Sequence, residues 1–499
     1  MRRRAYDIAI VSAFALVASC SSASPSRPVP PSLPGAALAS APGVVTVRFY
    51  DRHGNLLSPS QARSVMTNGS HGWANDALVD PTTLQDVAAG PLHTSGGSLV
   101  FDIPARPAAL ALNWPTSRGY SLVIVDDGGG GFAAPATVNF TYQAALDAKR
   151  RLADMVAARP TYVASAAFDD ADARAASLIQ RATQAPDESD RGRLGQRALD
   201  QVNVANDLLL SEFGPADAHT RRAPSPPWIG TTLDTTTNHD ARLDLARATT
   251  APLGWVRIVF DRNRPPSDYA GMVRAAKARG LEIMGEPVDS FYAKHYTRPQ
   301  YLRQVRACVN AFPQIDAWEV GNEVNGSWLG PGIGGKVADA ASWVKRHSSA
   351  SVVLTLYWQI GTDSPASSMF NWVRAHLPAS TRRNIDVVLM STYVEDAPLG
   401  LAFDEVMRTL HAEFPDQRIG IGELDYWSPD TSRAWWAFDR RDPTATARHE
   451  VASQYYAASL GYPYAVGGGF WWYFAEEGPP DAQLRAAIHR VVRDVVSGR

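Results

Sequence analysis

Two glutamates stand where this sequence could carry out acid–base chemistry. Glu323 follows the run Ala-Trp-Glu-Val-Gly-Asn, and Glu423 follows the run Arg-Ile-Gly-Ile-Gly. Each run is short, and small or polar residues come just before its glutamate. A pair of carboxyl groups can cleave a glycosidic bond when one holds a proton and the other is ionised. The pair therefore indicates glycoside chemistry, provided that the fold brings the two side chains together.

The elements that must position these glutamates begin near residue 224, where the chain starts to alternate between strand and helix. The expected strands are Trp228–Thr232, Trp255–Asp261, Glu282–Pro287, Ala317–Asn322, Ser351–Tyr357, Ile385–Thr392, Arg418–Glu423 and Gly468–Tyr473. The expected helices include Tyr269–Arg279, Tyr301–Ala311, Val337–His347, Phe370–His376, Phe403–Phe414, Thr446–Leu460 and Ala482–Val496. Most strands are continuously apolar, which is typical of parallel strands covered on both faces.

Eight strand–helix units over residues 217–499 predict a C-terminal (β/α)₈ TIM barrel. A doubly wound open sheet is the alternative, but no glycine-rich dinucleotide fingerprint follows the first strand. In a barrel the active site lies at the carboxyl ends of the strands. Glu323 and Glu423 end the fourth and seventh strands, which face one another across the mouth. In retaining glycosidases two such groups lie about 5–5.5 Å apart.

Asn322-Glu323 after the fourth strand, together with Glu423 after the seventh, resembles clan A of the glycoside hydrolases. The resemblance covers about residues 224–499. It implies that Glu323 is the general acid/base and that Glu423 is the nucleophile. It also implies that Asn322 binds the sugar 2-hydroxyl beside the scissile bond.

The same resemblance suggests several supporting residues. Tyr393 would donate a hydrogen bond to the nucleophile, and Arg257 would lie near it, although a surface or helix-facing salt bridge is the alternative for Arg257. Trp472 would form a sugar platform at the end of the eighth strand. Glu286, at the third strand end, is expected to contact substrate or to serve local structure. Two further tryptophans would either line flanking subsites or pack locally, namely Trp328 and Trp427.

The pattern departs from one family of the clan and matches another locally. Family 5 members often carry His-x-Tyr after the sixth strand, whereas this chain has Ser391-Thr392-Tyr393. The segment Val320–Gly332 looks like the acid/base segment of family 53 endo-β-1,4-galactanases. Neither comparison names the substrate.

Composition excludes several other functions. The net charge is −2, without the basic stripe that nucleic-acid binding requires. The 11 histidines are scattered and show no zinc-binding spacing, and no Gly-x-Ser-x-Gly elbow occurs. Two carboxylates and water suffice for glycoside hydrolysis, so neither a cofactor nor a metal is expected.

The N-terminus reads as an export signal. Three arginines precede an apolar run, and Val17-Ala18-Ser19-Cys20 resembles the lipobox of bacterial lipoproteins. The resemblance implies that residues 1–19 are a signal peptide and that Cys20 is lipidated. Residues 20–43, rich in Ser and Pro, would form a disordered tether that holds the protein to a bacterial membrane outside the cytoplasm. A plain secretory signal is the alternative.

The middle of the chain divides by its periodicity. Residues 44–141 predict a small β-sandwich, and residues 142–216 predict a helical hairpin or linker of two or three helices. Asp126-Asp127 and the four glycines after it could cradle a calcium ion, but the absence of further ligand spacing favours a hairpin turn.

The sequence therefore predicts a monomeric, lipid-anchored retaining glycoside hydrolase that acts on a β-linked polysaccharide or oligosaccharide. Two alternatives stay open. The first is a surface protein that binds glycan without cleaving it, and the second is a transglycosylase that remodels cell-wall glucan. The residues do not distinguish hydrolysis from transfer, because both use the same covalent intermediate.

Overall fold

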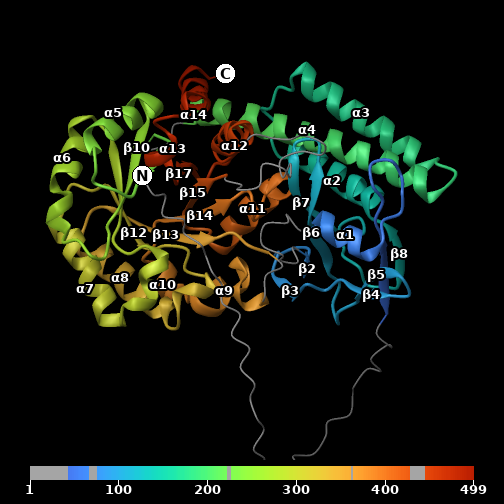
Figure 1. Ribbon diagram of the computed structural model, residues 1–499, viewed down its shortest axis with the longest axis horizontal. Helices are drawn as coiled ribbons and strands as arrows, with labels where there is room; N and C mark the ends of the chain where they lie inside the picture. The colour runs from blue at the N-terminus through green and yellow to red at the C-terminus, as the bar shows by residue number, and fades with distance from the viewer. Residues whose placement is uncertain (1–42, 67–75, 222–225, 361–363, 427–443, 499) are drawn as a thin grey trace, which may run out of the picture. The chain divides into compact units, whose positions relative to one another are not determined.

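The C-terminal strands close into a ring in the computed structural model (Figure 1). The strands are β9 (Ile229–Leu233), β10 (Gly254–Val259), β11 (Glu282–Glu286), β12 (Ala317–Gly321), β13 (Ser351–Tyr357), β14 (Val387–Tyr393), β15 (Arg418–Asp425), β16 (Ala465–Gly468) and β17 (Phe470–Trp471). All pairings are parallel, β14 pairs with β15, and β17 pairs with both β15 and β9. The predicted eight-stranded barrel is confirmed, and the open sheet is excluded because the ring has no free edge.

The structure describes residues 43–66, 76–221, 226–360, 364–426 and 444–498. The expected signal peptide, Cys20, nearly all of the tether and Trp427 lie outside these ranges, so their roles stay predictions. Within these ranges, no helix is both long and apolar enough to cross a membrane.

The eighth barrel strand differs from the expectation of one continuous strand over Gly468–Tyr473. It consists of two short pieces, β16 and β17, separated at Gly469. Gly469 has φ +134°, and a Cβ there would lie 2.5 Å from the ring of Tyr456. Only glycine tolerates this conformation and this close approach, so the backbone breaks at that position.

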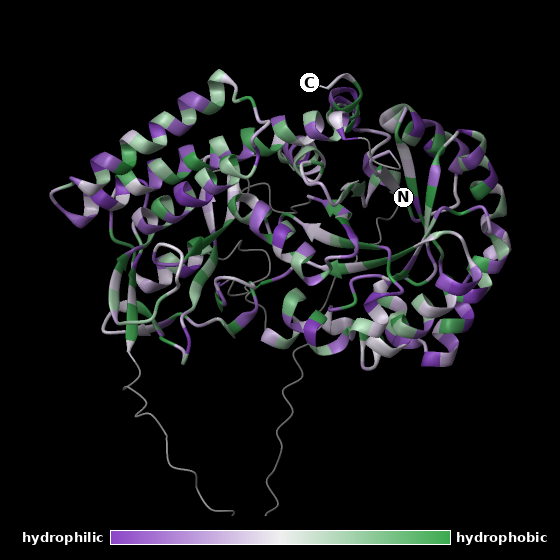
Figure 2. Cartoon of the chain, turned by 180° about the vertical axis from the view of Figure 1, so that it is seen from behind, coloured by the Kyte–Doolittle hydropathy of each residue, from purple (hydrophilic) through white to green (hydrophobic). Residues whose placement is uncertain are grey.

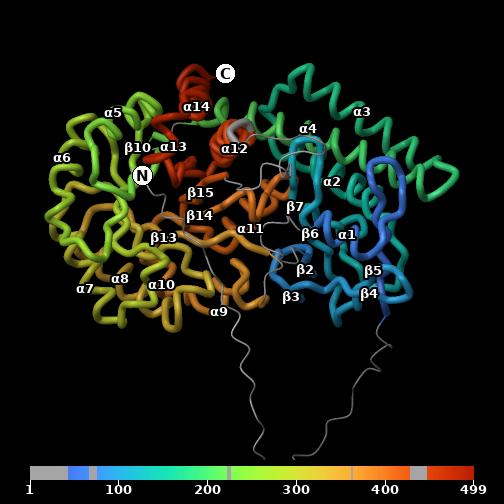
Figure 3. Tube along the Cα trace, viewed as in Figure 1, coloured from blue at the N-terminus to red at the C-terminus, as the bar shows by residue number. Residues whose placement is uncertain are grey.

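Helices surround the barrel strands, as the chain trace shows (Figure 3). They are α5 (His239–Thr250), α6 (Ala270–Ala278), α7 (Arg298–Ala311), α8 (Ile333–His347), α9 (Met369–His376), α10 (Ala379–Arg382), α11 (Phe403–Glu413), α12 (Thr444–Ala458), α13 (Phe474–Glu477) and α14 (Ala482–Ser497). Hydrophobic residues run along the strands, and hydrophilic residues alternate with them on the helices (Figure 2).

Small sheets and helices precede the barrel, as predicted. One sheet has the order β4 (His93–Ser95), β5 (Ser98–Asp102), β1 (Val44–Arg48), β8 (Ala136–Asn139), and the other has the order β3 (Asp86–Ala89), β2 (Asp76–Val79), β6 (Ala109–Thr116), β7 (Gly119–Val125). Helix α1 (Pro59–Met66) accompanies them, and α2 (Phe140–Ala157), α3 (Ala166–Thr183) and α4 (Glu188–Thr220) follow. The rings of Phe49, Trp114 and Phe140 pack together with centroids 4.8–5.4 Å apart.

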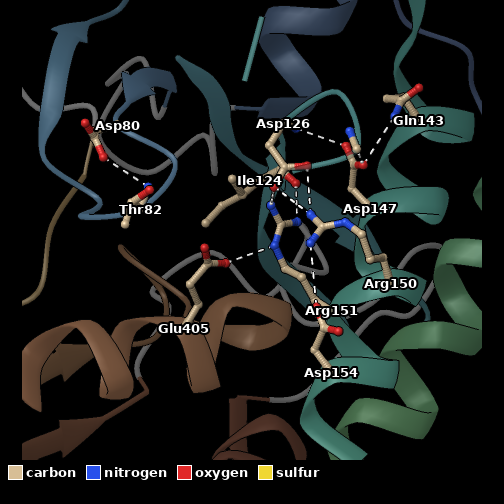
Figure 4. Close-up of polar contacts among 11 residues, drawn as sticks. Asp80, Thr82, Ile124, Asp126, Gln143, Asp147, Arg150, Arg151, Asp154 and Glu405 are labelled. Carbon is tan, nitrogen blue, oxygen red and sulfur yellow. Dashed lines mark hydrogen bonds and ion pairs between the residues drawn. The ribbon is translucent and has the colours of Figure 1, made fainter. Parts of the chain in front are cut away.

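Ion pairs join this N-terminal part to the barrel helix α11 (Figure 4). Arg151 of α2 lies 2.5 Å from the carboxylate of Asp126 and 3.0 Å from that of Glu405 on α11. Arg159 lies 2.5 Å from Asp404, and both side chains are buried. Buried pairs of this kind contribute little net stability, but breaking one leaves an uncompensated charge.

The segment of Asp126, Asp127 and the four glycines after it was expected to form a hairpin turn, with a calcium site as the alternative. Arg150 donates to both oxygens of the Asp126 carboxylate, and Gly129 and Gly131 donate backbone hydrogen bonds to the Asp126 carbonyl oxygen. The segment is therefore a turn. Across the chain that the structure describes, no group of three or more His, Cys, Asp or Glu side chains could hold a metal ion.

Buried acids on α4 give the fold a pH dependence. Burial raises the pKa of Asp200 to about 6 and that of Asp207 to about 7. Asp200 and Asp207 therefore bind their protons more tightly in the folded protein than in the unfolded chain. Their contribution to the free energy of unfolding is complete below about pH 4 and is lost as the pH rises to about 7.

We therefore expect Asp207→Asn to be increasingly stabilising, relative to the unchanged protein, as the pH rises from about 4 to 7. Asparagine keeps the oxygen that accepts from Gln454 at 2.5 Å but does not titrate. Melting temperatures across this pH range measure the effect, and exposed Asp416→Asn is the matched control. A difference between Asp207→Asn and the unchanged protein that stays constant with pH would contradict the prediction.

Candidate active site

The barrel interior is filled in layers, because every second residue of a strand points inward. The lowest layer is an apolar cluster, separate from the main core, that draws on strands all around the ring. Its members are Trp228, Trp255, Met284, Ala317, Val353, Val387, Leu389, Val466 and Phe470. Two positions further along four of these strands the inward residues are polar, namely Arg257, Glu286, Glu319 and Thr355, and each is at most 1% exposed. A polar layer thus lies on an apolar floor, nearer the carboxyl ends of the strands.

Arg257 is the centre of this polar layer. Its Nε and Nη2 both lie 2.8 Å from Oε2 of Glu319, and Nη2 lies 3.0 Å from Oε2 of Glu286. Its Nη1 lies 2.6 Å from Oε1 of Glu423. The guanidinium also lies 4.9 Å from the ring centroid of Trp472. Arg257 is therefore a buried group inside the barrel, which rules out the alternative of a surface or helix-facing salt bridge.

Glu423 lies near the carboxyl end of β15. The pairing of β15 with β14 skips one residue here, because Met390 pairs with Ile421 and the next residue, Ser391, pairs with Glu423. The hydroxyl of Tyr393 donates to its Oε2 at 2.7 Å, while Arg257 binds its Oε1. The Tyr393 hydroxyl and the Arg257 guanidinium thus lie against the two different oxygens of the Glu423 carboxyl group. Burial, and then the charge of Glu423, raise the pKa of Tyr393 well above its ordinary value, so the phenol keeps its proton and remains a donor.

Glu323 follows β12 in a left-handed conformation with φ +49°. A non-glycine residue in this region costs about 1–3 kcal/mol, and such strain is concentrated at functional sites. Neighbouring residues of an extended strand point to opposite faces, but this turn ends the alternation. As a result, Asn322 and Glu323 both contact residues at the end of β11 or just beyond it.

The surroundings of Glu323 favour its protonated form. Burial, and then the charge of Glu423, raise the pKa of Glu323 well above its ordinary value. A hydrogen bond from Ser290 in the short helix η2 (Ser290–His295), 2.8 Å long, acts in the opposite direction. Glu323 and Glu423 both stand toward the carboxyl ends of parallel strands of one ring, so the two carboxyl groups belong to the same end of the barrel.

In the Asn322-Glu323 pair, two buried oxygens lack a hydrogen-bond partner among the residues that the structure describes. Asn322 donates its amide N–H to Oε1 of Glu286 at 2.9 Å, which leaves Asn322 Oδ1 without a hydrogen bond. Oε1 of Glu323 also has none. Buried polar atoms normally have partners, so both are candidates for contact with a bound molecule. Glu286 is fully buried and contacts both Arg257 and Asn322.

Aromatic side chains border the two glutamates. Trp472 is half-buried above Arg257, whereas Trp471 is fully buried and donates to Glu477 outside the ring. Trp328, in η3 (Ser327–Leu329), donates its indole N–H to Ser290 at 3.2 Å and packs edge-on against Tyr357 at the end of β13. The rings of Tyr357 and Tyr393 lie 6.4 Å apart.

Sequence reasoning missed four residues of this site, namely Glu319, Thr355, Ser290 and Tyr357. Glu319 could have been found from the sequence, because it is a charged residue in an otherwise apolar strand and such a residue needs a buried partner. Tyr357 had a weaker signal in its place at a strand end. Ser290 and Thr355 had none, because their roles depend on contacts between different strands and loops.

No protein-family model matches the chain, and no curated protein matches its sequence. Among solved structures, a family 113 β-1,4-mannanase shares 12% identity over 54% of this chain and 99% of its own, with a TM-score of 0.38. A family 10 xylanase from Thermobacillus composti shares 13% identity over 55% and 97%, with a TM-score of 0.36. A family 128 endo-β-1,3-glucanase from Amycolatopsis mediterranei, solved with laminaritriose, shares 11% over 53% and 98%, with a TM-score of 0.32.

These are distant structural likenesses to clan A glycoside hydrolases, and they concern the barrel fold. Identities of 11–13% assign neither a substrate nor a catalytic residue to this chain. The chemistry of the site has to be argued from its own geometry.

Arg257 offers a direct test of the buried charge network. Replacing it with Met leaves Glu286, Glu319 and Glu423 without their shared cation, so we expect a loss of about 3–5 kcal/mol in the free energy of unfolding near pH 7.5. The loss should shrink near pH 5, because uncompensated carboxylates then take up protons. Denaturant titrations at both pH values measure it.

Arg298→Met is the matched control, because Arg298 pairs with Asp339 at the surface. We expect it to change the free energy of unfolding little at either pH. Equal losses for the two variants would show that the charge network does not stabilise the barrel.

Proposed function

We propose that this chain is a retaining glycoside hydrolase that cleaves β-linked polysaccharides or oligosaccharides, with Glu323 as acid/base and Glu423 as nucleophile. The observation that carries the proposal is the contrast between two carboxyl groups at one end of the barrel. Arg257 and Tyr393 stabilise the charge of Glu423. Glu323 is 6% exposed and lies within electrostatic reach of that charge, which raises its pKa. Double displacement needs one ionised and one protonated carboxyl group.

The two steps of the reaction follow from this contrast. In the first step Glu423 attacks the anomeric carbon, the bond to the leaving oxygen breaks, and Glu323 gives its proton to that oxygen. The resulting ester on Glu423 carries no charge. The charge of Glu423, which after burial is the largest cause of the raised pKa of Glu323, is then gone, so the pKa of Glu323 falls. Glu323 then accepts a proton from water, which attacks the anomeric carbon and releases Glu423.

Other residues would hold the sugar rather than react with it. The unpartnered Oδ1 of Asn322 is placed to accept a hydrogen bond from a sugar hydroxyl. Trp472, next to Arg257, and Trp328, next to Ser290, would supply aromatic rings that stack on sugar rings. Glu286 contributes indirectly by holding Asn322.

Glu423→Gly tests the nucleophile. We expect turnover on the best substrate of a polysaccharide panel to fall by several orders of magnitude, since no group remains to attack the anomeric carbon. Added azide should partly restore bond cleavage by entering the vacated space, with a glycosyl azide of inverted configuration as product. Reducing-end assays and NMR of the product measure both effects.

Glu282→Gly is the matched control, because Glu282 is exposed at the opposite end of the barrel strands. It should keep wild-type turnover. Near-normal turnover of Glu423→Gly would exclude the role. Glycan binding without any product in the unchanged protein would support a binding protein, and products longer than the substrate would support transfer.

Glu323→Ala tests the acid/base through the leaving group. Loss of a general acid costs about 10²–10⁴-fold for leaving groups that need protonation. Aryl glycosides with acidic phenols leave without a proton, so their first step should be nearly unaffected. Pre-steady-state release of the phenol, compared across leaving groups, measures this difference, and an equal loss for all leaving groups would contradict the assignment.

A further inference from the structure

We infer that Ser290 is a positioning residue for Glu323. Its hydroxyl, oriented by Trp328, binds one oxygen of the carboxyl group and leaves the transferable proton on the other. This inference rests on the proposed function of Glu323, and it goes further by assigning the two carboxyl oxygens different tasks.

Three groups form a chain of hydrogen bonds in one direction. The indole N–H of Trp328 donates to Oγ of Ser290 at 3.2 Å, and Ser290 donates to Oε2 of Glu323 at 2.8 Å. An indole nitrogen can only donate, so it occupies an acceptor position of the serine oxygen and leaves the hydroxyl hydrogen for the carboxyl group.

Trp328 is itself held in place, which makes its effect on Ser290 a fixed one. Its ring packs edge-on against Tyr357, with centroids 5.2 Å apart. A Cβ on Gly326 would lie 2.5 Å from the indole, so the ring covers the backbone of Gly326 closely. Ser290 is 6% exposed, so bulk water competes little for its hydroxyl.

The other oxygen of the carboxyl group is the one left for chemistry. Oε1 of Glu323 is buried and has no hydrogen-bond partner in the described part of the chain. Because Oε2 accepts from Ser290, a proton on Glu323 is placed on Oε1, where no protein group competes with the glycosidic oxygen for it. Removing the serine hydroxyl would let the proton reside on either oxygen.

Ser290 also sets how tightly Glu323 holds its proton. The titratable and charged groups that act on Glu323 come from several elements: Glu423 on β15, Asp289 before η2, Arg257 on β10, Tyr357 on β13 and Tyr393 on β14. Glu423 and Asp289 raise the pKa of Glu323, whereas Arg257 and the Ser290 hydrogen bond lower it. Of the two groups that lower the pKa of Glu323, Arg257 carries a charge and Ser290 does not. Ser290 can therefore be replaced without altering the charge of the site.

We expect Ser290→Ala to move the alkaline limb of the kcat/KM profile upward by about one pH unit, because the ionised carboxyl group loses a donor. Ser290→Thr keeps the hydroxyl and should restore the wild-type limb. Trp328→Phe removes the indole N–H together with part of the ring, so it should shift the limb in the same direction by less, whatever it does to KM. Ser327→Ala, the same change at the exposed first residue of η3, should leave the limb in place.

A second readout does not depend on turnover. The infrared band of the protonated carboxyl group, taken as the difference from Glu323→Gln, reports the titration midpoint of Glu323 itself. A higher midpoint in Ser290→Ala and a normal one in Ser290→Thr support the inference even if no glycoside is cleaved, in which case the proposed function alone fails. An unmoved midpoint and limb in Ser290→Ala overturn the inference and leave the proposed function standing.

Discussion

One guanidinium faces three carboxyl groups inside a closed ring of strands, and this imbalance governs the chemistry of the site. Arg257 contacts Glu286, Glu319 and Glu423 while fully buried. Burial is the largest cause that raises the pKa values of Glu286 and Glu319, and Arg257 opposes it. Charges of one sign raise each other's proton affinity in a medium of low dielectric. Glu423 also accepts a hydrogen bond from Tyr393, whereas Glu323 accepts one from the neutral hydroxyl of Ser290.

The apolar floor makes this arrangement possible. The cluster around the stacked pair Trp228 and Trp255, whose centroids lie 4.2 Å apart, fills the barrel below the polar layer. The next inward-pointing residue of each strand, two positions after a member of this cluster, must lie on the apolar floor even when it is polar. The backbone is irregular at both glutamates, since Glu323 has a left-handed conformation just after β12 and the β14–β15 register shifts at Glu423.

The N-terminal sheets and helices and the barrel form one compact unit, and this unit extends from Pro42 to Arg499. Ser121 of β7 accepts a hydrogen bond of 2.6 Å from the backbone of Leu401, and Arg159 of α2 pairs with Asp404. Directional buried contacts of this kind fix how two surfaces fit more than they add stability. They hold helix α11 and the short helix η5 (Gly400–Ala402) just before it against the part of the chain that precedes the barrel.

The sequence by itself determined the alternation of strands and helices, the barrel, and the strand ends where Glu323 and Glu423 stand, because period and burial are written in neighbouring residues. Through the clan resemblance it also pointed to Tyr393 as a donor to Glu423 and to Arg257 near Glu423, and it named Glu286 without its partners. Only the tertiary structure decided that Arg257 joins three carboxyl groups, that Asn322 turns its amide toward Glu286, and that Ser290 links Trp328 to Glu323. It also decided that the eighth strand breaks at Gly469. These contacts join residues that are up to 166 positions apart (423 − 257), and such pairs meet only when the ring closes.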